Sequence, residues 1–313
     1  MEHPEKNLIF TTFVSNPNAD GSQNLMHRES SFQMYFRNIA VALVSARHYN
    51  RESSVALVTA VREEEIPSEF LQICRENQIL IIHIPFDDFT FPDSYTWTLS
   101  FYRACALKHL LEMDYERFCC LDADVYVQGS YDPIWKECDQ HLLLFDINHG
   151  LNVPDYQRFM EEVRKWYGEE RYAVQYGGEF VAGNREACRT FNEKCHEVYT
   201  QMIARGTKVS TGDEFMYGIA ACECGTLIKN AGGYVYRFWT RTFRLVATSY
   251  EYNKVTVLHL PSEKERGLLK LYRRYIAKGK IPSEKTVWRT CYLLHSSLRD
   301  RVGRLYLKLS HHD

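Results

Sequence analysis

Short apolar runs alternate with helical patterns through the first 127 residues of the chain. The runs are rich in β-branched and aromatic residues, as strands are, and the segments between them repeat apolar residues at intervals of three and four. The expected strands are 7–14, 54–61, 79–84 and 117–127, and the expected helices are 31–48, a short helix after Pro67, and 96–113. Because helices that join successive strands make those strands parallel, the alternation predicts an α/β fold with a mostly parallel sheet flanked by helices. The third strand, ILIIHI, is apolar enough to predict burial on both faces.

The second half of the chain is less regular. We expect strands at 141–146, 176–181 and 255–260 and helices at 185–205 and 213–221. A length of 313 residues suits one large domain with an appendage. The character of the sequence changes near Ser262, so we predict a main domain over 1–262 and a helical extension over 263–313.

The predicted extension is basic although the whole chain is slightly acidic. The net charge is −2, whereas residues 263–313 contain 13 Lys and Arg against 5 Asp and Glu. Seven residues there are spaced by three and four and would form one helical stripe: Trp288, Tyr292, His295, Leu298, Val302, Leu305 and Leu309. Such a helix either lies on an anionic membrane surface or docks on its own domain. Because the positive charge is confined to the extension, nucleic acid is not an expected partner.

The cysteine pattern and the N-terminus favour a cytoplasmic protein. The ten cysteines lie in apolar runs or on helical faces and do not have the spacing of a secreted disulfide framework. The first residues, MEHPEKNLIF, are charged and lead straight into a strand, so no signal peptide is visible. No uncharged apolar run approaches the roughly 20 residues of a membrane helix. We therefore expect reduced thiols and a protein that is cytoplasmic, either free or peripheral on the inner membrane face.

Two carboxylates follow a buried strand pattern in the segment FCCLDADVYV, residues 118–127. Burying unpaired charge is costly, so Asp122 and Asp124 are not expected there for packing. Ligands bind at the carboxyl ends of strands in an open parallel sheet, and paired carboxylates suit a hard divalent cation. A turn capped by an aspartate is the alternative. The context predicts a Mn²⁺ or Mg²⁺ site.

The longer stretch YRACALKHLLEMDYERFCCLDADVYV, residues 102–127, resembles the signature of GT-A-fold glycosyltransferases that use nucleotide sugars. It is closest to the retaining families that include glycogenin and the bacterial lipooligosaccharide galactosyltransferases. The resemblance implies a Rossmann-like GT-A domain. It also implies that Asp122 and Asp124, with Ala123 between them, hold the cation on the diphosphate of a UDP-sugar, and that Arg103 contacts the donor. The donor's uracil and ribose would lie at the end of the first strand, on Thr11, Thr12 and Phe13; Phe13 is equally suited to the core.

Two later segments resemble related enzymes. YGGEFVAGN, residues 176–184, is similar to the Gly-Gly-x-Phe-x-x-Gly segment of blood-group-type transferases, where glycines such as Gly178 let substrate approach the backbone. Those enzymes have an Asp-Glu pair further on, as Asp213 and Glu214 do here. The resemblance implies that Glu214 is the nucleophile or stabilises the reacting sugar face, and that Asp213 holds sugar hydroxyls. From the residues alone, the pair is equally good chemistry for starting a helix.

A late strand pattern ends in a histidine, in VTVLHLPSEK. In the glycogenin-like group such a histidine completes the metal shell and is followed by a glycine and by a lysine that grips the diphosphate. The resemblance assigns these roles to His259 and Lys264, but Leu260 stands where the family has its glycine. A histidine at a strand end is also a common structural residue.

Together these patterns predict a metal-dependent hexosyltransferase. It would transfer a sugar from a nucleoside-diphosphate sugar, preferably a UDP-hexose, to a glycan or lipid-linked acceptor, and the resemblance implies retention. The nucleotide-sugar half would span about 1–128 and the acceptor half about 129–262. The residues alone leave inversion open, with Asp213 or Glu214 as base. One alternative is a sugar-nucleotide nucleotidyltransferase, which the absence of Lys and Arg from the loop at 15–23 disfavours; the other is a non-catalytic protein of the same fold that binds sugar nucleotide.

Overall fold

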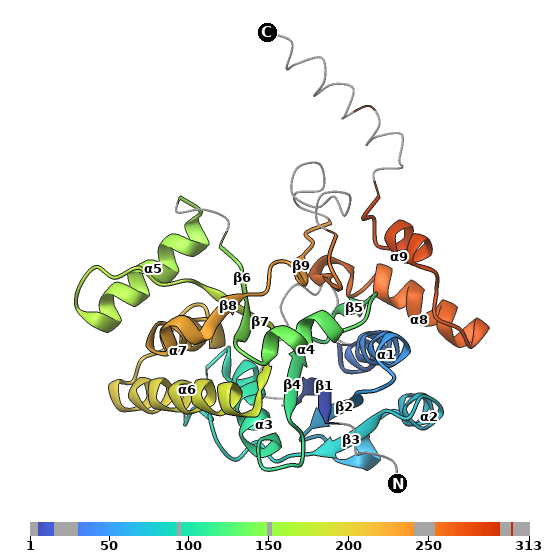
Figure 1. The fold of residues 1–313 in the computed structure, drawn as a ribbon, viewed down its shortest axis with the longest axis horizontal. Helices are drawn as coiled ribbons and strands as arrows, with labels where there is room; N and C mark the ends of the chain where they lie inside the picture. The colour runs from blue at the N-terminus through green and yellow to red at the C-terminus, as the bar shows by residue number, and fades with distance from the viewer. Residues whose placement is uncertain are drawn as a thin grey trace.

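The computed structural model describes residues 6–15, 31–92, 95–148, 152–240, 254–294 and 302. A seven-stranded sheet runs through this part of the chain in the order β3-β2-β1-β4-β7-β6-β8 (Figure 1). Its strands are β1 (Asn7–Phe13), β2 (Ser54–Thr59), β3 (Leu80–His83), β4 (Arg117–Leu121), β6 (Leu142–Asp146), β7 (Tyr176–Asn184) and β8 (Ile228–Asn230). All are parallel except β7, which is antiparallel to both of its neighbours. The predicted mixed, mostly parallel sheet flanked by helices is confirmed.

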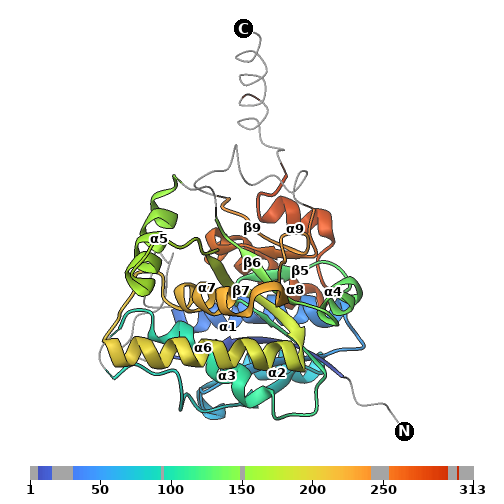
Figure 2. The same ribbon diagram turned by 60° about the vertical axis from the view of Figure 1, so that its left-hand side comes forward.

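The two faces of the sheet support two separate apolar layers. Side chains alternate along β1, so that Ile9 packs into one layer while Leu8 and Phe10 pack into the other. The first layer contains α1 (Ser31–Tyr49), α2 (Ser68–Glu76), α4 (Asp132–Cys138), α8 (Gly267–Lys278) and α9 (Glu284–Thr290). The second contains α3 (Tyr102–Leu110), α5 (Pro154–Tyr167), α6 (Arg185–Arg205) and α7 (Asp213–Cys224). Helix α8 lies alongside α1 in both views (Figures 1 and 2).

The chain reverses its winding between β1 and β4. Helix α1, which follows β1, lies in one layer, and α3, which precedes β4, lies in the other. The two strands are neighbours, with Thr11 opposite Leu121. A ligand site in an open α/β sheet is expected at such a switch point, beyond the carboxyl ends of the strands. Asp122 follows β4 directly at this point.

The predicted strand 117–127 is two strands rather than one. It ends as β4 at Leu121, and after a turn the chain resumes as β5 (Val125–Val127) in a separate three-stranded sheet with β9 (Val235–Arg237) and β10 (Val257–His259). In that sheet Val125 pairs with His259. The break places Asp122 and Asp124 in the turn between two sheets, and the pairing of β5 with β10 brings His259 next to them.

Other expectations need smaller corrections. Strand β3 is not buried on both faces, because it is an edge strand on which Leu80 is 43% exposed. The helix expected at 96–113 begins as a 3₁₀ turn at Thr98–Phe101 and is α-helical only over Tyr102–Leu110. Helix α5 was not anticipated from the sequence.

The predicted stripe in the C-terminal extension is interrupted within the described residues. Helix α9 ends at Thr290, and Tyr292 has a φ of 58°, which a continuing helix does not allow. Trp288 packs against the residue that follows β5, where its Nε1 donates to Gln128 Oε1 at 2.8 Å. His295, Leu298, Leu305 and Leu309 lie outside the described residues. Among the helices that are described, none is long and apolar enough to cross a membrane.

Candidate active site

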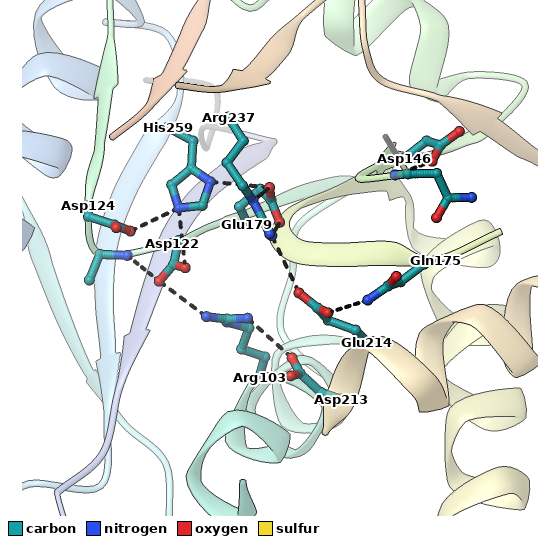
Figure 3. A network of polar contacts seen from close by, with 12 residues as sticks. Arg103, Asp122, Asp124, Asp146, Gln175, Glu179, Asp213, Glu214, Arg237 and His259 are labelled. Carbon is teal, nitrogen blue, oxygen red and sulfur yellow. Dashed lines mark hydrogen bonds and ion pairs between the residues drawn. The ribbon is translucent and has the colours of Figure 1, made fainter. Parts of the chain in front are cut away.

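Three potential metal ligands converge in the turn between the two sheets. A carboxylate oxygen of Asp122, one of Asp124 and a ring nitrogen of His259 all lie within 4.8 Å of one another. His259 Nε2 is 3.2 Å from Asp124 Oδ1 and 3.8 Å from Asp122 Oδ2 (Figure 3). The backbone fixes the turn, since Asp122 N–H donates to the Glu179 carbonyl and Leu260 N–H donates to the Asp124 carbonyl. The structure therefore brings together the three residues that the sequence suggested as metal ligands.

Charge pairing keeps the buried members of this cluster ionised. Burial alone would favour a neutral Asp124, but Lys264 and His259 outweigh it and hold the pKa of Asp124 well below its ordinary value. Burial alone would also favour a neutral His259, yet Asp124 and Glu179 raise the pKa of its imidazole to about 9. The raised pKa favours a protonated imidazole, and its Nε2 faces both aspartates.

The cluster fits a hard divalent cation in three respects. The donors are two carboxylates and one imidazole, which suit Mn²⁺ or Mg²⁺ better than a soft metal. His259 Nδ1 lies 3.1 Å from Glu179 Oε1, and a carboxylate partner of this kind leaves Nε2 directed at a metal. Asp124 Oδ2 is buried and accepts no hydrogen bond from the described residues; its contact is an ion pair with Lys264 Nζ at 3.1 Å.

The two aspartates are also paired with positively charged side chains. Arg103 Nη2 is 3.1 Å from Asp122 Oδ1, and His259 and Lys264 pair with Asp124. The family resemblance assigned Arg103, His259 and Lys264 to the same site as the aspartates. These ion pairs therefore lie within the predicted site and not in an unrelated part of the core. The Asp122 side chain is also 25% exposed, which leaves this ligand accessible from outside.

Arg103 links the aspartate turn to helix α7. Its Nη1 is 3.2 Å from Asp213 Oδ2, while its Nη2 reaches Asp122. This arrangement depends on Gly178, because a Cβ there would overlap the Arg103 guanidinium and lie 2.8 Å from Asp213 Oδ2. The glycine predicted to admit substrate to the backbone therefore admits a side chain of the protein itself.

Asp213 and Glu214 begin helix α7 without capping it. The N-cap residue is Gly212, with a φ of 63°, and no side chain caps the helix. Asp213 instead pairs with Arg103, and Glu214 Oε2 accepts a 2.8 Å hydrogen bond from Gln175 Nε2. Burial raises the pKa of Glu214 to about 7, although nearby Arg237 opposes the shift. The helix-start interpretation explains the position of this pair but not the direction of its side chains.

Two residues of the site were not anticipated from the sequence. Glu179 on β7 is 1% exposed, and Arg237 on β9 grips it through two 2.7 Å hydrogen bonds, from Nε to Oε1 and from Nη2 to Oε2. Arg237 Nη2 also lies 3.4 Å from Glu214 Oε1. A charged residue inside the apolar run YGGEFVAGN was the available signal for Glu179, whereas no pattern in the sequence marks Arg237.

The residues expected to hold the base and ribose lie at the end of β1, but they are not aligned on an open surface. Thr11 is fully buried, and its hydroxyl has no hydrogen bond among the described residues. Phe13 packs in an aromatic cluster with three residues of α1, at ring separations of 5.7, 5.7 and 5.0 Å: Phe32, Tyr35 and Phe36. Thr12 is half-buried beside them. The loop at 15–23 lies outside the described residues except for Ser15.

Comparison with solved structures shows that the chain resembles known proteins in fold. The chain is similar to the crystal structure of mouse xyloside xylosyltransferase 1 in its apo form, with 12% identity and a TM-score of 0.49 over 80% of this chain and 96% of that chain. No protein-family model matches the sequence, and no curated protein matches it significantly.

Proposed function

We propose that this protein is a metal-dependent glycosyltransferase that uses a nucleoside-diphosphate sugar, preferably a UDP-hexose. The observation that carries the proposal is the convergence of Asp122, Asp124 and His259 at the switch point of the sheet, with Arg103 and Lys264 paired to the same carboxylates. A metal site flanked by the positively charged side chains of Arg103 and Lys264 is suited to a diphosphate, which carries negative charge on several oxygens. The sequence resemblance at residues 102–127 supports the same class of reaction.

In this proposal, Asp122, Asp124 and His259 would hold Mn²⁺ or Mg²⁺, which when bound supplies positive charge against the diphosphate. Arg103 and Lys264 neutralise the charge that develops on the departing diphosphate. Both cations now pair with aspartates and turn toward the donor when it binds. Base and ribose lie at the end of β1, near Thr12 and Phe13.

Glu214 and Asp213 would face the reacting sugar. Glycosyl transfer builds positive charge at the anomeric carbon, and a nearby carboxylate stabilises that charge. With a pKa of about 7, Glu214 is poised to act either as a carboxylate or as a proton acceptor near neutral pH. Retention follows from the family resemblance and forms part of the proposal. The acceptor is a glycan or a lipid-linked sugar, and the basic extension would bring the enzyme to an anionic membrane surface.

A thermal-shift screen of nucleotide sugars with and without Mn²⁺ tests the proposal. A UDP-sugar at about 100 times its Kd should stabilise the full-length chain by about 2.7 kcal/mol. This stabilisation should require Mn²⁺ and disappear in Asp124→Ala and in Asp122→Ala, the second of which removes a partly exposed carboxylate at less risk to folding. Asp114→Ala, at an exposed position just before β4, is the matched control.

Slow Mn²⁺-dependent hydrolysis of the same donor would distinguish a transferase from a protein that only binds it. The proposal is wrong if no nucleotide sugar stabilises the chain, or if the stabilisation is equal without Mn²⁺ and in Asp122→Ala. Binding without any release of sugar would keep the site and reject the enzyme.

A further inference from the structure

A second cluster of potential metal ligands lies on a different face of α3 from Arg103. Cys105 and His109 are four residues apart and therefore share one face of the helix. Asp87, from the segment that follows β3, meets them there. Its Oδ1 is 3.5 Å from Cys105 Sγ and 2.9 Å from His109 Nε2, and the three donor atoms all lie within 4.8 Å of one another.

The two separations that involve Asp87 Oδ1 are close to those of a tetrahedral zinc site. With ordinary zinc–ligand bonds, neighbouring ligand atoms are about 3.5 Å apart for sulfur and oxygen and about 3.3 Å apart for nitrogen and oxygen. The sulfur–oxygen distance here is 3.5 Å, and the nitrogen–oxygen distance of 2.9 Å needs to widen by only a few tenths of an ångström. Asp87 Oδ1 is hydrogen-bonded to His109, and it is one of two acceptors at 3.5 Å from the Cys105 thiol, the other being the Pro85 carbonyl. A cation would take the place of the protons between these three side chains.

The donor chemistry selects zinc over the cations suited to the first cluster. A thiolate and an imidazole are borderline-soft ligands, whereas Mn²⁺ and Mg²⁺ prefer oxygen. The first cluster, which consists of Asp122, Asp124 and His259, contains no sulfur ligand. The two clusters would therefore select different metals. Three protein ligands leave the fourth zinc position for a water molecule.

The surroundings hold the ligands in place and leave a way in. Asp88, next to Asp87, accepts the Phe89 N–H at 2.7 Å and pairs with Lys108 at 2.6 Å, and Phe89 is fully buried. Cys105 is buried on the inner side. The side chains of His109 and Asp87 on the outer side are 37% and 51% exposed, so a cation can approach from solvent.

We propose that Asp87, Cys105 and His109 form a zinc site that ties the segment after β3 to helix α3. Binding releases the thiol proton of Cys105 to solvent and moves the proton of a neutral His109 imidazole from Nε2 to Nδ1, so that two metal–ligand bonds replace the Asp87–His109 hydrogen bond. Because Arg103 lies one half-turn before Cys105 on the same helix, the bound ion would also hold Arg103 in position. None of its ligands belongs to the first cluster, so the zinc proposal stands or falls separately from the proposed transferase function.

Cobalt substitution tests this site selectively. A thiolate bound to Co²⁺ gives a charge-transfer band in the near ultraviolet, which the sulfur-free first cluster cannot produce. Titrating the reduced full-length chain with Co²⁺ should give this band at one equivalent, and Zn²⁺ should abolish it by competition. His109→Gln and Asp87→Asn should each weaken Zn²⁺ binding, measured against a chromophoric chelator, by at least about tenfold, because even outer partners of metal ligands contribute that much.

Cys105→Ala should abolish the band, while Cys74→Ala, which removes a buried cysteine from α2, should leave it unchanged. His109 and Asp87 are partly exposed, so their variants are expected to fold, and circular dichroism checks this. The proposal is overturned if Co²⁺ binding produces no charge-transfer band. It is equally overturned if zinc affinity is the same in wild type, His109→Gln and Asp87→Asn.

Discussion

Replacing Glu214 with glutamine should change stability in a way that depends on pH. The pKa of Glu214 is raised from 4.5 to about 7 by burial, while the unfolded chain keeps the ordinary value. Below pH 4.5 the group is protonated in both states and contributes no penalty. Between pH 4.5 and 7 only the unfolded chain ionises readily, so the free energy of unfolding falls as pH rises. Above pH 7 the folded chain carries the whole cost of ionisation. At about 1.36 kcal/mol per pKa unit, this cost is about 3 kcal/mol.

Glu214→Gln keeps the size of the side chain and cannot ionise. Relative to wild type, the variant should therefore gain about 2–3 kcal/mol of unfolding free energy between about pH 5 and about pH 8, measured by urea denaturation at both pH values. Glu223→Gln, at an exposed position on the same helix, should change stability by less than about 0.5 kcal/mol at either pH. If the difference between wild type and Glu214→Gln is the same at both pH values, Glu214 is not a carboxyl with a raised pKa. If Glu214→Gln also loses transferase activity while it gains stability, Glu214 is retained for activity at a cost in stability.

Two further substitutions test the architecture around the proposed metal ligands. Glu179→Gln should weaken Mn²⁺ binding by about 10–100-fold in a calorimetric titration, because it removes the carboxylate that orients His259; unchanged affinity would show that Glu179 does not orient the ligand. Gly178→Ala should lower the free energy of unfolding by about 1–3 kcal/mol, because its methyl group would overlap Arg103. Gly233→Ala, where a Cβ has no neighbour within 4 Å, is the control, and equal effects of the two alanines would refute the packing argument.

The fold of the first half could be predicted because its signals are local. The apolar periodicities of α1 and β2 appear within each segment and do not depend on distant partners. The sequence misleads where the structure of a segment depends on the strand with which it pairs. Strand β3 has an apolar sequence, yet among the described strands it pairs with β2 alone and lies at an edge. The segment FCCLDADVYV is apolar on both sides of its aspartates, and only pairing with β10, more than a hundred residues later, shows that it contains two strands.

The residues of the candidate site also differ in whether a local sequence signal or a distant contact reveals them. Asp122 and Asp124 could be found because two charges interrupt an apolar run. His259 was suggested only by resemblance, and its position is set by the β5–β10 pairing. Arg237 could not have been found, because it lies on a three-residue strand in an irregular part of the sequence and acquires its role only through contact with Glu179. Charges that form a network across several strands are a property of the folded chain.

The buried charges alternate in sign from the proposed metal ligands to the candidate catalytic carboxylate. Asp124 contacts His259, which contacts Glu179, which is gripped by Arg237, which reaches Glu214. Removing Glu179 frees Arg237 to pair more closely with Glu214, so neutralising both acids leaves a buried arginine without a carboxylate among these partners. Buried charge without a partner is expensive, so the destabilisation in Glu179→Gln/Glu214→Gln should exceed the sum of the single effects by about 0.5–3 kcal/mol. Additive effects in this double-mutant cycle would mean that the two carboxylates do not share Arg237, and that the metal ligands and Glu214 are electrostatically separate.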